Sequence, residues 1–105
     1  MAGSGLTVAV AAVSATCAVA LCAVAAGAVE GQRAAAAADA AALAAADAAS
    51  GAIPGYPCER AQEVAGALGF EVAECDLSAL IATVSVRGGI GPMHATATSR
   101  AGPPP

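Results

Sequence analysis

The pattern of apolar and polar positions divides the first half of this chain into two segments. Residues 6–29 form an apolar run of mostly small side chains that contains no charge. Over 30–51 alanine still dominates, but acidic residues recur eight positions apart, at Asp39 and Asp47. Neither segment contains proline, and alanine has the highest helix propensity of all residues. We therefore expect one long N-terminal helix in two parts.

The first segment has the length of a membrane span. As a helix, residues 6–29 would rise roughly 36 Å, against about 30 Å for the hydrocarbon core of a bilayer. Small side chains insert less strongly than Leu or Phe, but they suit close packing against other helices. We expect a transmembrane anchor here, after a short tail over 1–5. A secretory signal cleaved near Ala25 and a buried core helix are the alternatives.

Two cysteines, Cys17 and Cys22, lie inside the apolar run. Five positions apart on a helix, they would point about 140° away from each other. They cannot pair within one helix, and we interpret both as small apolar residues.

The second segment predicts a stalk helix. Its aspartates argue against a second membrane span, and Leu43 falls midway between them. Gly27 and Gly31 are expected to loosen the junction with the first segment. A linker over 52–57, rich in Gly and Pro, ends the helix. The stalk is interpreted either as a spacer or as an assembly surface.

The pattern changes again over 58–100, where we expect a small domain. Apolar positions recur first at helical spacing and then with period two. The strands are expected over 70–75, 80–87 and 93–98, with turns at Asp76–Ser78 and over 88–92. The predicted class is α+β: a long transmembrane and stalk helix, then an α-β-β-β domain with a three-stranded antiparallel sheet. Residues 101–105 are expected to form a disordered tail.

The apolar core expected for this domain is small. It consists of Val64, Leu68, Phe70, Val72, Leu80, Val84, Val86 and Met93. Domains of this size usually need a covalent or metal staple. The expected helix from Cys58 rises roughly 15 Å and the strand to Cys75 returns by a similar distance, so antiparallel packing would bring the two cysteines together.

A disulfide between Cys58 and Cys75 is the expected staple, with buried free thiols or a metal site as alternatives. A metal site would lack ligands, because the chain has one histidine and no CxxC pair. A disulfide indicates an oxidising compartment, which places the domain outside the cytoplasm.

Composition and motifs point away from several classes of function. The net charge is −4 and lysine is absent, so we expect no nucleic-acid binding. His94 is interpreted as a solvated surface residue, and no recognisable catalytic motif is present. We expect no enzyme, no cofactor or metal site, and no small-molecule substrate.

The uncharged span, Arg33 and the Ala-Asp-Ala-Ala-Ala-Leu-Ala stretch over 38–44 resemble TadE/TadG-like proteins of the Flp (tight adherence) pilus machinery. The likeness is greatest to the actinobacterial helicase/secretion neighbourhood TadE-like proteins. Arg33, Asp39 and Leu43 match the motif, and the resemblance implies a structural role for them. Conventional pilins carry a Glu a few residues into the mature helix, whereas the first acid here is Glu30.

The resemblance implies a pseudopilin-like minor component of a type IV-related pilus or secretion apparatus. Its partners would be the membrane and other pilus or secretion-system membrane proteins. It would cross the cell membrane once and display the small domain outside. The alternative function is a secreted, disulfide-bonded binding protein released by signal cleavage.

Overall fold

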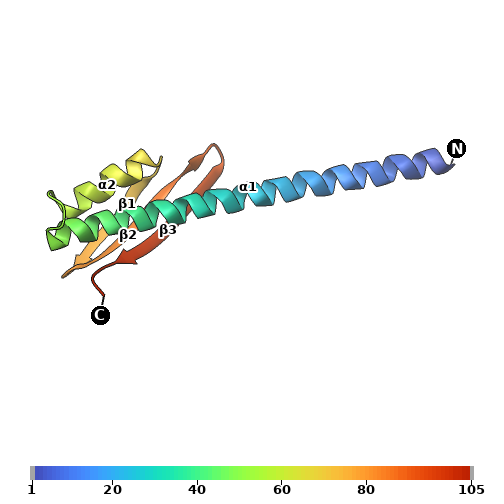
Figure 1. The fold of residues 1–105 in the computed structure, drawn as a ribbon. Helices are drawn as coiled ribbons and strands as arrows, with labels where there is room; N and C mark the ends of the chain where they lie inside the picture. Colours follow the sequence, from blue (N-terminus) through green and yellow to red (C-terminus); the bar gives the residue numbers. More distant parts are fainter. Residues whose placement is uncertain (1, 105) are drawn as a thin grey trace.

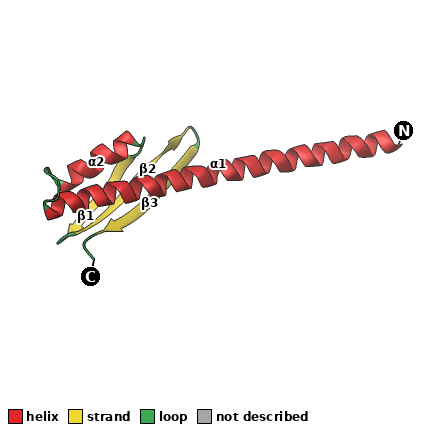
Figure 2. Ribbon diagram, in the orientation of Figure 1, coloured by secondary structure: helices red, strands yellow, loops and turns green. Residues whose placement is uncertain are grey.

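The computed structural model describes residues 2–104 as two helices and one sheet (Figure 1, Figure 2). In chain order the elements are α1 (Ala2–Ser50), α2 (Pro57–Ala67), β1 (Glu71–Ser78), β2 (Ile81–Ile90) and β3 (Met93–Ala101). The expected α+β class is confirmed, including the long first helix and the three-stranded antiparallel sheet. Both helices lie on one face of the sheet, and the N-terminal part of α1 projects away from it (Figure 1).

Helix α1 runs without interruption through both segments that the sequence separates. Its 49 residues rise roughly 73 Å, which matches the 75 Å long axis of the molecule. The tail expected over 1–5 is helical from Ala2 onward, Met1 lying outside the described residues. Gly27 and Gly31 do not break the helix: both face open space, and a single glycine costs only about 1 kcal/mol relative to alanine within a helix. The helix ends at Ser50, where Gly51 adopts a φ of 83°.

Helix α2 begins and ends at residues suited to those places. Pro57 occupies the first turn, where its missing N–H is no loss, and Glu59 places a negative charge near the helix N-terminus. At the other end Gly69 adopts a φ of 83°. The chain then turns back, and the backbone N–H of Phe70 donates to the carbonyl of Ala65 at 2.9 Å. This reversal starts β1 alongside the helix.

Strand β2 is central and pairs antiparallel with β1 on one side and β3 on the other. Val84 lies opposite Cys75 of β1 and Ser99 of β3. Alternate residues of β2, namely Ala82, Val84 and Val86, are fully buried. Because side chains alternate along a strand, the residues between them face the side that no helix covers.

Each strand extends further than the sequence pattern predicts. The turn expected at Asp76–Ser78 is strand, and the chain reverses one residue later, with Ala79 at a φ of 57°. The end of β3 lies at Ala101, which was expected to belong to the disordered tail. Residues 102–104 have no regular structure, and Pro105 lies outside the described residues.

Two glycines that were expected to form a turn continue β2 instead. A Cβ on Gly88 would lie 2.7 Å from the ring of Phe70, and one on Gly89 would overlap the backbone carbonyl of Met93. Glycine is therefore required here by close approach within the sheet. The turn itself is short, with Gly91 at a φ of 61° before Pro92, as in a two-residue hairpin turn.

The core is built mainly from alanines of α1. One face of the helix has six residues with 0% exposure at spacings of three and four: Ala34, Ala37, Ala38, Ala41, Ala42 and Ala45. Ala61 and Ala65 of α2 join them, and Val84 and Val86 of the sheet fill the space between. Small side chains let both helices and the sheet approach closely. The segment over 30–51 is therefore part of the domain and does not act as a separate spacer.

The core expected from sequence is correct only in part. Phe70, Val84 and Val86 are buried, and Val64, Val72 and Met93 are half-buried. Leu68 and Leu80 are 45% and 42% exposed, because each lies next to a turn, at the end of α2 and before β2. The alanine face of α1 takes the place that these leucines were expected to fill.

Candidate functional site

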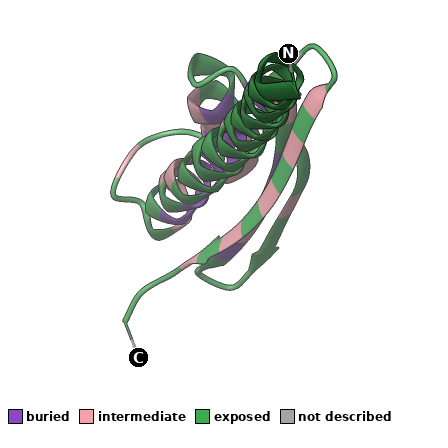
Figure 3. Ribbon diagram, turned by 90° about the vertical axis from the view of Figure 1, so that its right-hand side faces the viewer, coloured by how far each residue is buried: buried purple, intermediate pink, exposed green. Residues whose placement is uncertain are grey.

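The N-terminal part of α1 is an apolar surface that none of the described residues of the domain covers. Residues 2–29, called here the apolar half-helix, contain no charge, and none before Ala26 is even partly buried. Leu6, Val19 and Leu21 are each about 70% exposed. Figure 3 shows the part of α1 nearest the N-terminus in the colour of exposed residues. The helix is long and apolar enough to cross a membrane. Apolar patches of this extent mark contact with lipid or protein, or a segment that is removed.

Hydroxyl groups on the apolar half-helix make hydrogen bonds within the helix itself. The Oγ1 of Thr7 donates to the carbonyl of Gly3, and that of Thr16 to the carbonyl of Ala12, both at 2.8 Å. Such bonds satisfy a hydroxyl where no water is present, so these two threonines are compatible with a lipid environment.

The two cysteines of the apolar half-helix, Cys17 and Cys22, are free and exposed. Their positions on α1 are those expected from the sequence. Nothing that the structure describes lies against them, so they add small, weakly polar surface to the helix.

The junction between the apolar half-helix and the domain is formed by Glu30, Arg33 and Phe70. The Nη1 of Arg33 donates to the Oε1 of Glu30 at 2.9 Å. The guanidinium carbon of Arg33 lies 6.0 Å from the ring centroid of Phe70, within range of a cation–π interaction. Arg33 thus joins α1 to the residue that precedes β1.

Glu30 is the one charged residue among those described that is buried, with 8% exposure. Its Oε1 receives the bond from Arg33, whereas its Oε2 is buried and has no hydrogen-bond partner among the described residues. A buried carboxylate oxygen without a donor is unfavourable. The carboxylate therefore has acceptor capacity left where the apolar half-helix ends.

The structure brings two of the three motif residues together and places the third elsewhere. Asp39 and Leu43 lie one turn apart and line a shallow groove of 350 Å³ beside the end of β3. The Oδ1 of Asp39 accepts a hydrogen bond from the Oγ of Ser99 at 2.5 Å. Leu43 is 57% exposed, so its side chain remains open to a neighbour. Arg33 instead lies at the junction described above.

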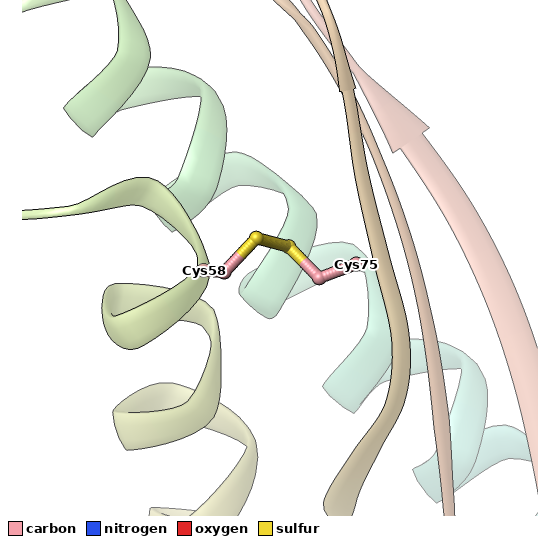
Figure 4. Close-up of a disulfide and its surroundings, with 2 residues drawn as sticks. All are labelled: Cys58 and Cys75. Carbon is pink, nitrogen blue, oxygen red and sulfur yellow. A yellow bond between two sulfur atoms is a disulfide. The ribbon is translucent and has the colours of Figure 1, made fainter.

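The expected disulfide is present between Cys58, in the first turn of α2, and Cys75, in β1 (Figure 4). The two Cα atoms are 5.9 Å apart, and 17 positions separate the residues in sequence. Because α2 lies against β1, the bond fixes the outer helix to the edge of the sheet. It staples a domain whose core is mostly alanine.

The remaining polar residues form no compact cluster of ligands or nucleophiles. His94 is exposed and borders an open hollow of 660 Å³ with Glu71, Arg87 and Thr96. The Nε of Arg87 donates to the Oε1 of Glu71 at 2.6 Å. Within residues 2–104, no group of three His, Cys, Asp or Glu side chains is placed to hold a metal ion.

Sequence reasoning missed the contacts of Ser99 and Phe70 with α1. Both are tertiary contacts between distant segments, and no local pattern signals them. The buried alanine face had one available signal: Asp39 and Asp47 define an outer side of the helix, which leaves the opposite side for packing. A search of protein-family models, curated proteins and solved structures finds no match to this chain.

Proposed function

We propose that this protein is a non-enzymatic, membrane-anchored assembly subunit of a pilus or secretion apparatus. The observation that carries the proposal is the division of α1. One half is an uncovered apolar helix, and the other half is the core of a small disulfide-stapled domain. A single rigid helix would thus connect the membrane to the displayed domain.

The surface of the apolar half-helix supports assembly by helix packing. Its residues are mainly Ala, Val, Gly, Ser and Thr. In lipid, helices gain association energy from close van der Waals contact, which small side chains permit. The resemblance to TadE-like proteins supports subunits of a type IV-related apparatus as the neighbours. The Cys58–Cys75 bond supports display of the domain outside the cytoplasm, where disulfides persist.

One observation favours a second candidate, a secreted domain released by cleavage near Ala25. None of the residues over 2–25 is buried, and the first buried residue of α1 is Glu30. Removal of the preceding residues would therefore leave the packing of the domain intact. In that case the small disulfide-bonded domain would act as a soluble binding protein.

Site-specific photo-crosslinking in the membranes of the producing organism tests the assembly role. A photoreactive residue at Val19, which is 70% exposed, should form adducts with the N-terminal helix of another subunit of the apparatus or of a second copy. The matched control is the same residue at Tyr56, which is 74% exposed but lies on the domain. Adducts of Val19 with lipid alone would contradict assembly through this helix.

A further inference from the structure

One end of the sheet lies close to the point where the apolar half-helix stops. We call it the hairpin end; it comprises Glu71, the residues of β2 from Arg87 onward, and β3 as far as Thr96. Figure 1 shows that the turn between β2 and β3 is the part of the sheet that reaches furthest toward the N-terminal half of α1.

Contacts between side chains fix the level of the hairpin end along α1. Arg33 lies over the ring of Phe70, and that ring abuts Gly88 of β2. From Gly88 the strand continues for two residues, or roughly 7 Å, before it turns. Along a helix, roughly 7 Å corresponds to between four and five residues. The turn therefore reaches about the level of Val29, the last residue of the apolar half-helix.

The position of the bilayer leaves little room between membrane and turn. If residues 6–29 cross a hydrocarbon core of about 30 Å, their roughly 36 Å leave about 6 Å of slack. The headgroup layer on each side is about 5–7 Å thick. Wherever the helix settles within that slack, Val29 lies at the core boundary or among the headgroups. The turn at the same level then lies among the headgroups too.

The distribution of charge agrees with this placement. Two carboxylates lie at the junction and hairpin end, and each is paired: Glu30 with Arg33 and Glu71 with Arg87. With His94 neutral, this end carries no net charge. The other six carboxylates and two arginines lie further from the apolar half-helix, so the whole net charge of −4 lies there. Anionic lipids would repel the far part of the domain and tolerate the near part.

We propose that the hairpin end rests on the lipid headgroups of the bilayer that α1 spans, with the Gly91–Pro92 turn in direct contact. The contact holds the domain in one orientation relative to the membrane. This inference rests on the proposed membrane anchoring, and the contact would be a second point of attachment to the membrane.

Tryptophan fluorescence in vesicles tests this contact, because the chain has no tryptophan of its own. Full-length Pro92→Trp is reconstituted in phosphatidylcholine–phosphatidylglycerol vesicles that carry a nitroxide quencher near the headgroups. Its emission should shift to shorter wavelength and be quenched. The matched control is Leu80→Trp, at the turn between β1 and β2, on an exposed residue at the opposite end of β2. Its emission should remain that of an indole in water and escape quenching.

A third variant, Leu21→Trp with a quencher deep in the bilayer, reports insertion of α1 separately. If Leu21→Trp is quenched but Pro92→Trp emits like Leu80→Trp, the contact is refuted and the anchor stands. A blue shift of Pro92→Trp without lipid quenching would show that protein covers the turn, which also refutes the contact. If Leu21→Trp escapes quenching, anchor and contact fail together. Should Pro92→Trp not form the Cys58–Cys75 bond, the exposed neighbour His94→Trp decides by the same criteria.

Discussion

The hydroxyl of Ser99 donates to the carboxylate of Asp39 and so joins the last strand to the long helix across 60 positions of sequence. Asp39→Ala should remove this bond and lower the free energy of unfolding by about 1 kcal/mol. Asp47→Ala is the control, because Asp47 is exposed on the same helix and its side chain has no partner among the described residues. Urea unfolding of the full chain in detergent micelles, followed by pulse proteolysis, measures the free energy of unfolding of both variants. Equal effects of the two substitutions would contradict the role of this bond.

The buried alanine face of α1 predicts that a larger side chain on this face destabilises the domain. Ala41→Leu adds volume at a position with 0% exposure and should destabilise the domain by about 1–3 kcal/mol through overpacking. Ala36→Leu makes the same change at an exposed position of the same helix and should alter stability by less than about 0.5 kcal/mol. The same unfolding assay compares them. If Ala41→Leu changed the free energy of unfolding as little as Ala36→Leu does, this part of α1 would be a spacer that is not packed in the domain.

The sequence predicts the elements of this fold correctly where apolar and polar positions alternate clearly or where helix-breaking residues occur. The period-two alternation over β2 and the breakers after Ser50 identify their elements correctly. In the alanine run only Asp39 and Asp47 distinguish one face of α1 from the other, and they do not show what the opposite face packs against. Gly88 and Gly89 suggest a turn locally, whereas contacts with Phe70 and Met93 keep them in the strand.

Some features of the candidate site could be predicted from the sequence, and the junction could not. The disulfide was predictable from local geometry, because the rise of the short helix after Cys58 is similar to the distance over which the strand returns to Cys75. The apolar half-helix follows from composition alone. The junction does not, since Arg33 meets Phe70 only after the sheet has folded against α1. That contact depends on the tertiary arrangement and has no signature in the flanking residues.

Substitution of glycine by alanine should have opposite effects at a crowded position of the sheet and at an open position of a helix. Gly89→Ala should destabilise by more than about 2 kcal/mol, because its φ of 154° disfavours a side chain and the new Cβ would overlap the carbonyl of Met93. Gly66→Ala, in α2 with open space around it, should stabilise by about 0.5–1 kcal/mol. Thermal unfolding monitored by circular dichroism gives the sign of each change. Stabilisation by Gly89→Ala would contradict the close approach of β2 and β3.

The disulfide should supply a large share of the stability of so small a core. Replacing both Cys58 and Cys75 by Ala is expected to lower the free energy of unfolding by about 3 kcal/mol, as for other loops of this size. Replacing Cys17 and Cys22 by Ala is the matched control and should leave the domain unchanged, because both are free and exposed on the apolar half-helix. Pulse proteolysis with and without reductant compares the two pairs. Insensitivity of the native chain to reduction would show that the alanine core suffices alone.

The membrane anchor is the central claim, and one measurement tests it most directly. Membranes of the producing organism are washed with alkaline carbonate, and the intact mass of the protein is determined without reductant. We predict an integral membrane protein that retains the apolar half-helix and whose mass is lower by two hydrogen atoms because of the Cys58–Cys75 bond. A soluble mature form that begins near Ala26 would contradict the anchor and establish the secreted alternative.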